Sequence, residues 1–398
     1  MTTNHFNAKS HAKTARTVKI DIMRFVAAVS VMLYHYVAWY TVNLPQESIA
    51  LHRAATITQF GWLGVPLFFM ISGYVILNSA LNRDVRQFAI ARFVRLYPMY
   101  WICLAATVAV LLVTGNLHGE PVRHSVLDLR TLLANLAMMQ EVRGCEPIDG
   151  VYWTLWKELQ FYVLMCVLIA TGVVKRVRVW LTTWLALTCT FLLFNQPFFM
   201  GWFISPEYSA CFIGGIAFSL IRTRGLNRFN GLVAILAAGL ACWEITRTAG
   251  TFMDVSTVSQ IVVCQIIVLL FFGLFGLVVM RKIDIKPSQR IATLGMITYP
   301  LYLLHNNIGK STMNQLLPVV PVELLAVGMS ITSIAIAWCV YSFVDKPTSH
   351  WLKSKLANNR PSESGGNCVT PPAFVVQREN RGKSARPDRR SDNHYQVR

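Results

Sequence analysis

Charged residues are scarce in this sequence. Only 14% of its 398 residues are Asp, Glu, Lys or Arg, whereas soluble domains contain about 25%. Apolar residues make up 54% of the chain, and the mean hydropathy is +0.44. This composition excludes an ordinary soluble domain and indicates an integral membrane protein.

Acidic residues are the scarcest of the charged ones. The chain has 19 of them against 37 Lys and Arg, which gives a formal net charge of +18. In a soluble protein this excess would suggest binding to nucleic acid. Here the basic residues stand between apolar segments, which favours the positive-inside rule for membrane proteins instead. We therefore expect membrane lipid, and no nucleic acid, as a partner.

The sequence also lacks the features of a disulfide-stabilised or processed secretory protein. Seven of its nine cysteines fall in apolar runs, where cysteine acts as a small buried side chain. The other two, Cys145 and Cys368, are expected on opposite sides of the membrane. No small-residue cleavage site follows the first apolar run, so we predict a retained membrane helix. No internal repeat and no second folded domain is apparent.

Ten apolar segments are long enough to be predicted as membrane-spanning helices. They are residues 20–41, 61–80, 97–115, 151–171, 179–196, 206–221, 229–247, 257–280, 291–310 and 321–343.

The distribution of positive charge predicts the orientation of this all-α, polytopic bundle. The loops of one side contain fourteen Lys and Arg, and those of the other side contain four. Both termini are therefore expected in the cytoplasm. The predicted organisation is a polar N-terminus over 1–19, a ten-helix transmembrane domain over 20–345, and a basic, disordered cytoplasmic tail over 346–398.

Two ionisable residues interrupt the first apolar run. Arg24 and His35 are eleven positions apart, about three helical turns, so both side chains emerge on nearly the same face. The rise between them is about 16 Å. Ionisable groups within a membrane usually face the bundle interior or a wet cavity. We predict that this helix lines a polar passage, although His35 alone is explained equally well as a hydrogen-bonding residue between helices.

Glu158 lies about seven residues into the fourth predicted span, at a depth similar to that of His35. One interpretation is that it pairs with Lys157 or another interfacial cation and only orients its helix. The other is that it orients His35 and stabilises its charged form, as the acid of a catalytic triad does.

Arg92 and Arg95 are three residues apart, so on a helix they share a face. The positive-inside rule explains arginines anywhere in this cytoplasmic loop. Two guanidinium groups on one face would also suit a ligand rich in phosphate, which arginine binds bidentately.

Two further segments favour structural interpretations. The stretch from Gly61 to Tyr74 mixes aromatic and small residues, which is typical of close helix packing. His305, near the outer end of the ninth predicted span, needs no special role at a membrane interface.

Five motifs in order resemble the bacterial membrane-bound acyltransferase family 3. They are Arg24 with ten residues before His35, Gly-Val-Pro-Leu-Phe-Phe-Met-Ile-Ser-Gly-Tyr, Ala-Arg-Phe-Val-Arg-Leu-Tyr-Pro, Trp-Thr-Leu-Trp-Lys-Glu-Leu-Gln-Phe-Tyr, and Leu-Gly-Met-Ile-Thr-Tyr-Pro-Leu-Tyr-Leu-Leu-His. The chain departs from the family pattern at Pro66, where many members carry Asp, and at Lys346, where Arg is common.

The resemblance implies an O-acyltransferase of the bacterial inner membrane. Such an enzyme takes an acyl group, usually acetyl, from cytoplasmic acyl-coenzyme A. It delivers the group to a sugar hydroxyl of a surface polysaccharide or lipid-linked glycan on the far side. No metal is expected. The resemblance assigns His35 and Glu158 to catalysis; Arg24, Arg92 and Arg95 to binding of the acyl-coenzyme A; and His305, Tyr302 and Trp153 to substrate contact or support.

Two other functions remain open from the sequence. Intramembrane His, Glu and Arg also mark the pathways of transporters, here an exporter of small acids or glycan precursors. The absence of inverted repeats and paired broken helices counts against that alternative. A non-catalytic assembly partner for polysaccharide synthesis would tolerate substitution of His35 and Glu158.

Overall fold

The computed structural model describes residues 3–43, 48–117, 120–121, 128–194, 201, 205, 207–253, 257–281, 283, 288–348 and 351. Of the predicted disordered tail over 346–398, all but residues 346–348 and Trp351 lies outside the described residues.

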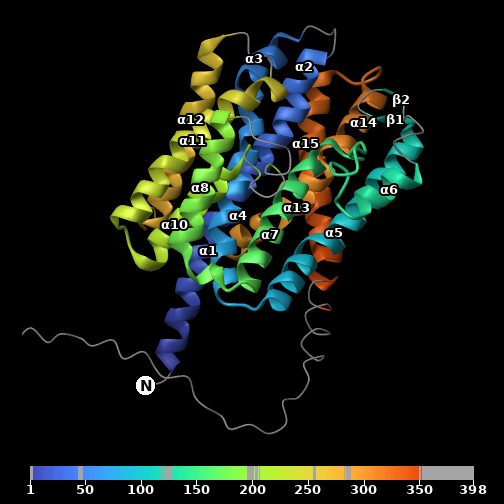
Figure 1. The fold of residues 1–398 in the computed structure, drawn as a ribbon. Helices are drawn as coiled ribbons and strands as arrows, with labels where there is room; N and C mark the ends of the chain where they lie inside the picture. The colour runs from blue at the N-terminus through green and yellow to red at the C-terminus, as the bar shows by residue number, and fades with distance from the viewer. Residues whose placement is uncertain are drawn as a thin grey trace, which may run out of the picture. The chain divides into compact units, whose positions relative to one another are not determined.

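The described residues are almost entirely helical (Figure 1). The longer helices are α1 (Thr3–Leu33), α4 (Gly64–Leu81), α5 (Val85–Thr114), α7 (Trp153–Ala170), α8 (Val177–Phe194), α10 (Ser209–Arg224), α11 (Arg228–Phe252), α12 (Val258–Val279), α13 (Gln289–Leu304) and α15 (Val322–Val340). The shorter ones are α2 (Trp39–Asn43), α3 (Ile49–Thr58), α6 (Leu129–Leu136) and α14 (Asn306–Leu316). Single 3-10 or π turns occupy Tyr34–Ala38, Gln59–Leu63, Gly150–Tyr152, Val173–Lys175 and Tyr341–Asp345. Two-residue strands β1 (Asn116–Leu117) and β2 (Glu120–Pro121) pair antiparallel.

The helices confirm a polytopic membrane protein. Among the described residues, eight helical segments are long and apolar enough to cross a bilayer. They are Val18–Thr41, Ile49–Leu81, Val85–Thr114, Gly150–Ala170, Val177–Phe194, Arg228–Phe252, Val258–Val279 and Val322–Thr348.

Two of the ten predicted spans form helices that are short for a membrane crossing. The segments predicted at 206–221 and 291–310 form α10 and α13, each of 16 residues. Such a helix is about 24 Å long, less than the roughly 30 Å of a hydrocarbon core. Every residue of α10 from Ser209 to Leu220 is buried, because α4, α8, α11 and α12 contact it. Apolarity there reflects burial in protein as much as contact with lipid.

Glycines let α4 and α10 approach at backbone distance. A Cβ atom at Gly73 of α4 would overlap the carbonyl oxygen of Phe212, and one at Gly215 of α10 would overlap that of Met70. This is the close packing of small residues that the segment from Gly61 to Tyr74 predicts.

We expect Gly215→Ala to destabilise the protein. The added methyl group meets a backbone carbonyl that cannot move aside, and overpacking of this kind costs about 1–3 kcal/mol. Thermal unfolding of the purified protein in detergent should show a lower melting temperature. The matched control is Gly239→Ala in α11, where a Cβ has no atom within 4 Å and the higher helix propensity of alanine is neutral or stabilising. Equal melting temperatures for the two variants would contradict the packing argument.

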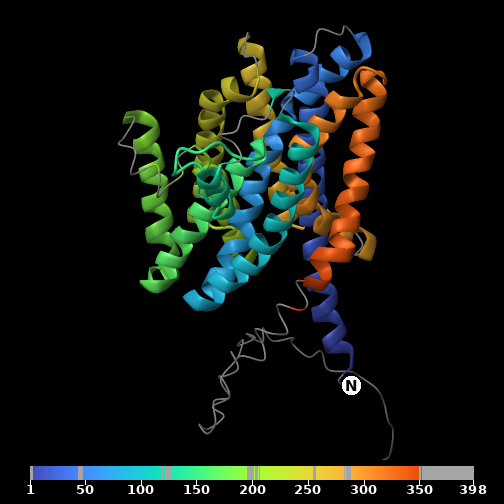
Figure 2. The same ribbon diagram turned by 90° about the vertical axis from the view of Figure 1, so that its right-hand side faces the viewer.

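Helix α1 packs against α4 and α13, and its N-terminal part extends from one end of the bundle (Figures 1 and 2). Glycines hold it against its neighbours as well. Added Cβ atoms at Gly61 and Gly64 would crowd the carbonyl oxygens of Ser30 and Ala27, and one at Gly295 would overlap Asp21. The helix that contains Arg24 and His35 is therefore fixed closely against its neighbours.

The first membrane helix widens into a π turn over Tyr34–Ala38, which contains His35, before α2 continues it. A π turn inside a helix is rare and is frequently found at functional sites.

Candidate active site

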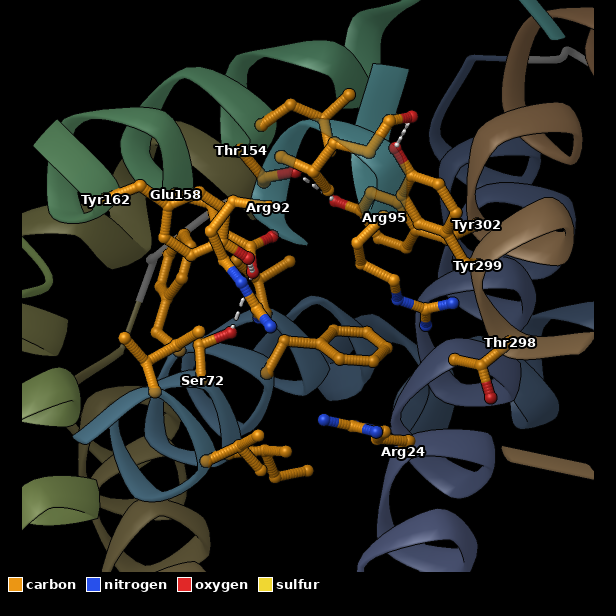
Figure 3. A pocket seen from close by; sticks show the side chains of 18 of the residues that line it. Arg24, Ser72, Arg92, Arg95, Thr154, Glu158, Tyr162, Thr298, Tyr299 and Tyr302 are labelled. Atoms are coloured by element: carbon orange, nitrogen blue, oxygen red, sulfur yellow. Dashed lines mark hydrogen bonds between the residues drawn. The ribbon is translucent and has the colours of Figure 1, made fainter. Parts of the chain in front are cut away.

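The three arginines singled out in the sequence line one cavity. Arg24 from α1 and Arg92 and Arg95 from α5 point into it, as Figure 3 shows. Its empty volume is about 850 Å³, including the part open to solvent. We call it the arginine cavity. As their spacing predicts, Arg92 and Arg95 share one face of α5.

Aromatic rings and an acidic side chain position these guanidinium groups. The Cζ atom of Arg92 lies 5.7 Å from the ring centroid of Tyr162, and that of Arg95 lies 5.5 Å from the ring centroid of Tyr299. Both distances are within the range of a cation–π interaction. A guanidinium nitrogen of Arg24 lies 3.7 Å from a carboxylate oxygen of Asp21, one turn earlier on α1.

Glu158 of α7 lines the same cavity. One of its carboxylate oxygens accepts a hydrogen bond from the hydroxyl of Ser72 at 3.0 Å and another from that of Tyr162. Among the described residues that line the arginine cavity, Glu158 is the only carboxylate. Three cations against one anion leave an excess of positive charge, which attracts an anionic ligand.

His35 lines a second cavity, whose empty volume is about 710 Å³. We call it the aromatic cavity because most of its lining side chains are rings. The described residues that line it are Val31, Tyr34, His35, Trp39, Trp62, Val65, Gly150, Val151, Trp153, Phe252, Tyr302, Asn306 and Lys310.

The two cavities are neighbours, because Val65 and Tyr302 line both. The hydroxyls of Tyr302 and Thr154 are hydrogen-bonded at 3.0 Å, and Thr154 lines the arginine cavity. Arg24 and His35 thus stand on one helix in successive chambers, as their spacing predicts.

The structure separates His35 from Glu158, which were expected at a similar depth. Trp153 reaches the aromatic cavity, whereas Glu158, five residues or about 7.5 Å further along α7, lines the arginine cavity. Two rings lie beside that of His35: Tyr34, with 4.9 Å between the ring centroids, and His305, with 5.3 Å.

His305 is 1% exposed, and its Nδ1 lies 3.1 Å from the carbonyl oxygen of Leu301 and 2.9 Å from that of Tyr302. A carbonyl oxygen can only accept, so Nδ1 bears the hydrogen and Nε2 of the neutral ring is an acceptor. Among the described residues, Nε2 of His305 has no hydrogen-bond partner. His305 therefore places a hydrogen-bond acceptor close to the ring of His35. The location of His305 near the end of a predicted span did not indicate this contact.

Three residues in or behind the aromatic cavity, Asp149, Asn306 and Lys310, were not singled out from the sequence as functional candidates. Asp149 is fully buried and accepts hydrogen bonds from Nδ2 of Asn306 at 2.8 Å and from the backbone of Asn307 at 3.0 Å. Burial raises the pKa of Asp149 to about 6, and its hydrogen bonds oppose that shift. Lys310 is 4% exposed, and its ammonium nitrogen lies 4.0 Å from the centroid of the Trp39 ring. The pair Asn306 and Asn307 directly after His305 was the only available signal.

Within the described ranges, no group of three or more His, Cys, Asp or Glu side chains is placed to hold a metal ion.

Comparison with known proteins relates this arrangement to a family. Residues 17–342 match the family model described as an acyltransferase domain. The chain is 26% identical to Nodulation protein 10 of Rhizobium leguminosarum over 37% of its own length and 43% of that protein's length. It is 25% identical to the peptidoglycan O-acetyltransferase OatA of Listeria monocytogenes over 36% of its length and 23% of the relative's length. It is 23% identical to the acyltransferase MdmB of Streptomyces mycarofaciens over 74% and 79% of the two lengths.

The chain thus spans less than half of two of these relatives and most of the third. No solved structure matches it significantly. The family match, in contrast, runs from the first membrane helix to the last. On that basis the chain belongs to this acyltransferase family and is a multi-pass membrane acyltransferase.

Proposed function

We propose that this enzyme transfers an acyl group, in the first place acetyl, from acyl-coenzyme A to a sugar hydroxyl of an extracytoplasmic polysaccharide or lipid-linked glycan. The bacterial inner membrane, with both chain termini in the cytoplasm, is the proposed location. The observation that carries the proposal is the pair of adjoining chambers, one with three arginines and one with His35, which share Val65 and Tyr302.

The arginine cavity suits the donor. Coenzyme A carries phosphate groups at one end and the thioester at the end of a long flexible arm. Arg92 and Arg95 would bind the phosphates through charge-assisted hydrogen bonds, and the arm would extend past Arg24. Glu158, held by Ser72 and Tyr162, would keep the guanidinium groups oriented rather than act on His35.

The aromatic cavity suits the acceptor. His35 would take the proton of an acceptor hydroxyl while its oxygen attacks the thioester carbonyl. The carbon–sulfur bond then breaks, and the thiolate of coenzyme A takes up a proton. His305, beside His35, would accept a hydrogen bond from the imidazole and hold it in the productive orientation, a role that the sequence assigned to Glu158.

The relatives support the acceptor class. One of them is named a peptidoglycan O-acetyltransferase, so its name states a glycan as acceptor and acetyl as the group transferred. Another is named an acyltransferase and covers most of both chains.

The direct test uses the purified protein in detergent with radiolabelled acetyl-coenzyme A and surface polysaccharide from a strain that lacks this chain. We expect label in the polysaccharide and release of free coenzyme A. A transporter would transfer nothing in detergent, where no compartments exist, and that result would reject the proposal. Mass spectrometry of the surface glycan, with and without the chain, would then identify the acylated sugar.

A further inference from the structure

The aromatic cavity has a wall of stacked rings. The ring centroids of Trp62 and Phe252 are 4.7 Å apart with planes at 17°, and those of Trp153 and Phe252 are 5.8 Å apart at 30°. Aromatic faces carry partial negative charge. The axial C–H groups of a pyranose ring carry partial positive charge, because each carbon bears an oxygen. Phe252 lies between the two tryptophans, so the outer face of Trp62 or Trp153 is the one that suits the flat face of a sugar ring.

Polar atoms of the lining complement the hydroxyl groups of a sugar. Nε1 of Trp62 is a donor and Oδ1 of Asn306 is an acceptor, and neither has a hydrogen-bond partner among the described residues. Both side chains are almost completely buried, so an unmet donor or acceptor there is unfavourable. The amide nitrogen of Asn306 is already bound to Asp149, which leaves its oxygen for a ligand.

Besides His35, the described part of the same lining contains one basic side chain, Lys310, which interacts electrostatically with the buried Asp149 behind the cavity. Lys310 contributes an ammonium group, whose place is fixed over the ring of Trp39. No carboxylate occurs among the described residues that line this cavity. Asp149, behind Asn306, directs its two oxygens to the donors of Val151, Asn306 and Asn307. The ion pairs formed between described side chains join Arg24 to Asp21 and Lys157 to Glu141 and Glu207, and do not include Lys310.

We propose that the aromatic cavity binds a pyranose ring that carries a carboxylate, with the sugar ring against the outer face of Trp62 or Trp153 and the carboxylate on Lys310. That this sugar is the acyl acceptor rests on the proposed function. In this arrangement Lys310 determines specificity, because it selects uronic acids over neutral sugars, and a hydroxyl of the bound ring lies toward His35 and Tyr302.

The test compares two probes, methyl β-D-glucuronide and methyl β-D-glucoside, by titration of tryptophan fluorescence in the purified full chain. We expect the glucuronide to bind about tenfold or more tightly than the glucoside, because a buried charge pair favours the anion. Lys310→Met should reduce this preference to about twofold or less, and Lys310→Arg should retain most of it. Lys175→Met, which removes an exposed lysine, is the matched control and should leave the preference intact.

The outcomes separate the two proposals. Equal binding of the two sugars by the unaltered protein, or a glucuronide preference that survives in Lys310→Met, would overturn the assignment of Lys310. Acetyl transfer from acetyl-coenzyme A to both methyl glycosides with equal kcat/KM would also overturn it, while the acyltransfer proposal stands. Lys310-dependent binding of the glucuronide without any transfer from acetyl-coenzyme A would support the sugar site and reject the proposed reaction. The comparison in the unaltered protein needs no variant, so it decides even if Lys310→Met does not fold.

Discussion

Replacing His35 by alanine is expected to lower acetyl transfer from acetyl-coenzyme A by about a thousandfold, since a positioned general base contributes about 10²–10⁴ to the rate. The loss should appear in kcat, because the proton transfer takes place in the transition state. The measurement is release of free coenzyme A by the purified variant, together with label in the polysaccharide.

Two controls accompany this variant. His52→Ala removes an exposed histidine of α3 and should keep full activity. His305→Ala should lose less activity than His35→Ala, because His305 acts through the orientation of the neighbouring ring. If His35→Ala retains more than about a tenth of the activity, with a normal melting temperature, His35 is not the base and the reaction proposed for the aromatic cavity is wrong.

The double variant Arg92→Ala/Arg95→Ala is expected to raise the KM for acetyl-coenzyme A by about a hundredfold or more. Each charge-assisted hydrogen bond to a phosphate is worth about 1.5–3 kcal/mol, and the variant removes two such donors. Acetyl-pantetheine has the same thioester arm without the phosphates. Its kcat/KM should therefore be low in the unaltered enzyme and change little in the variant.

Arg86→Ala is the matched control, because it removes an exposed arginine from the first turns of the same helix. It should leave the KM for acetyl-coenzyme A unchanged. An equal loss with acetyl-coenzyme A and acetyl-pantetheine would show that Arg92 and Arg95 support the structure of the cavity and do not bind phosphate.

Much of the fold followed from hydropathy, because a helix in lipid must satisfy its backbone groups internally and be apolar over the width of the bilayer. The same criterion also identified residues 206–221 and 291–310, but it did not indicate how their helices, of 16 residues each, are packed. It responds to apolar residues but not to what surrounds them, so it did not distinguish α10, buried among other helices, from a helix that faces lipid.

The site was predictable where its residues are close in sequence. Arg92 and Arg95 share a face because helix geometry requires it, and Arg24 and His35 line successive chambers for the same reason. Glu158 was placed at the level of His35, but its partners come from α4 and from its own helix. Contacts such as those of His35 with His305, and of Lys310 with Trp39, join residues about 270 positions apart. Nothing in a single sequence indicates such pairs. The π turn around His35 likewise has no local signature.

The first membrane helix, which the glycine contacts hold in place, sets the distance between Arg24 and His35. The rise of the helix fixes the separation of Arg24 and His35 along its axis, and the glycine contacts fix how the helix sits against its neighbours. If the proposed donor site is correct, a donor that contacts both Arg24 and His35 has to extend over roughly 16 Å along the helix axis. A small activated acid whose acyl group is bonded directly to phosphate would reach only one of them, so the length of the carrier itself would determine which thioester reacts.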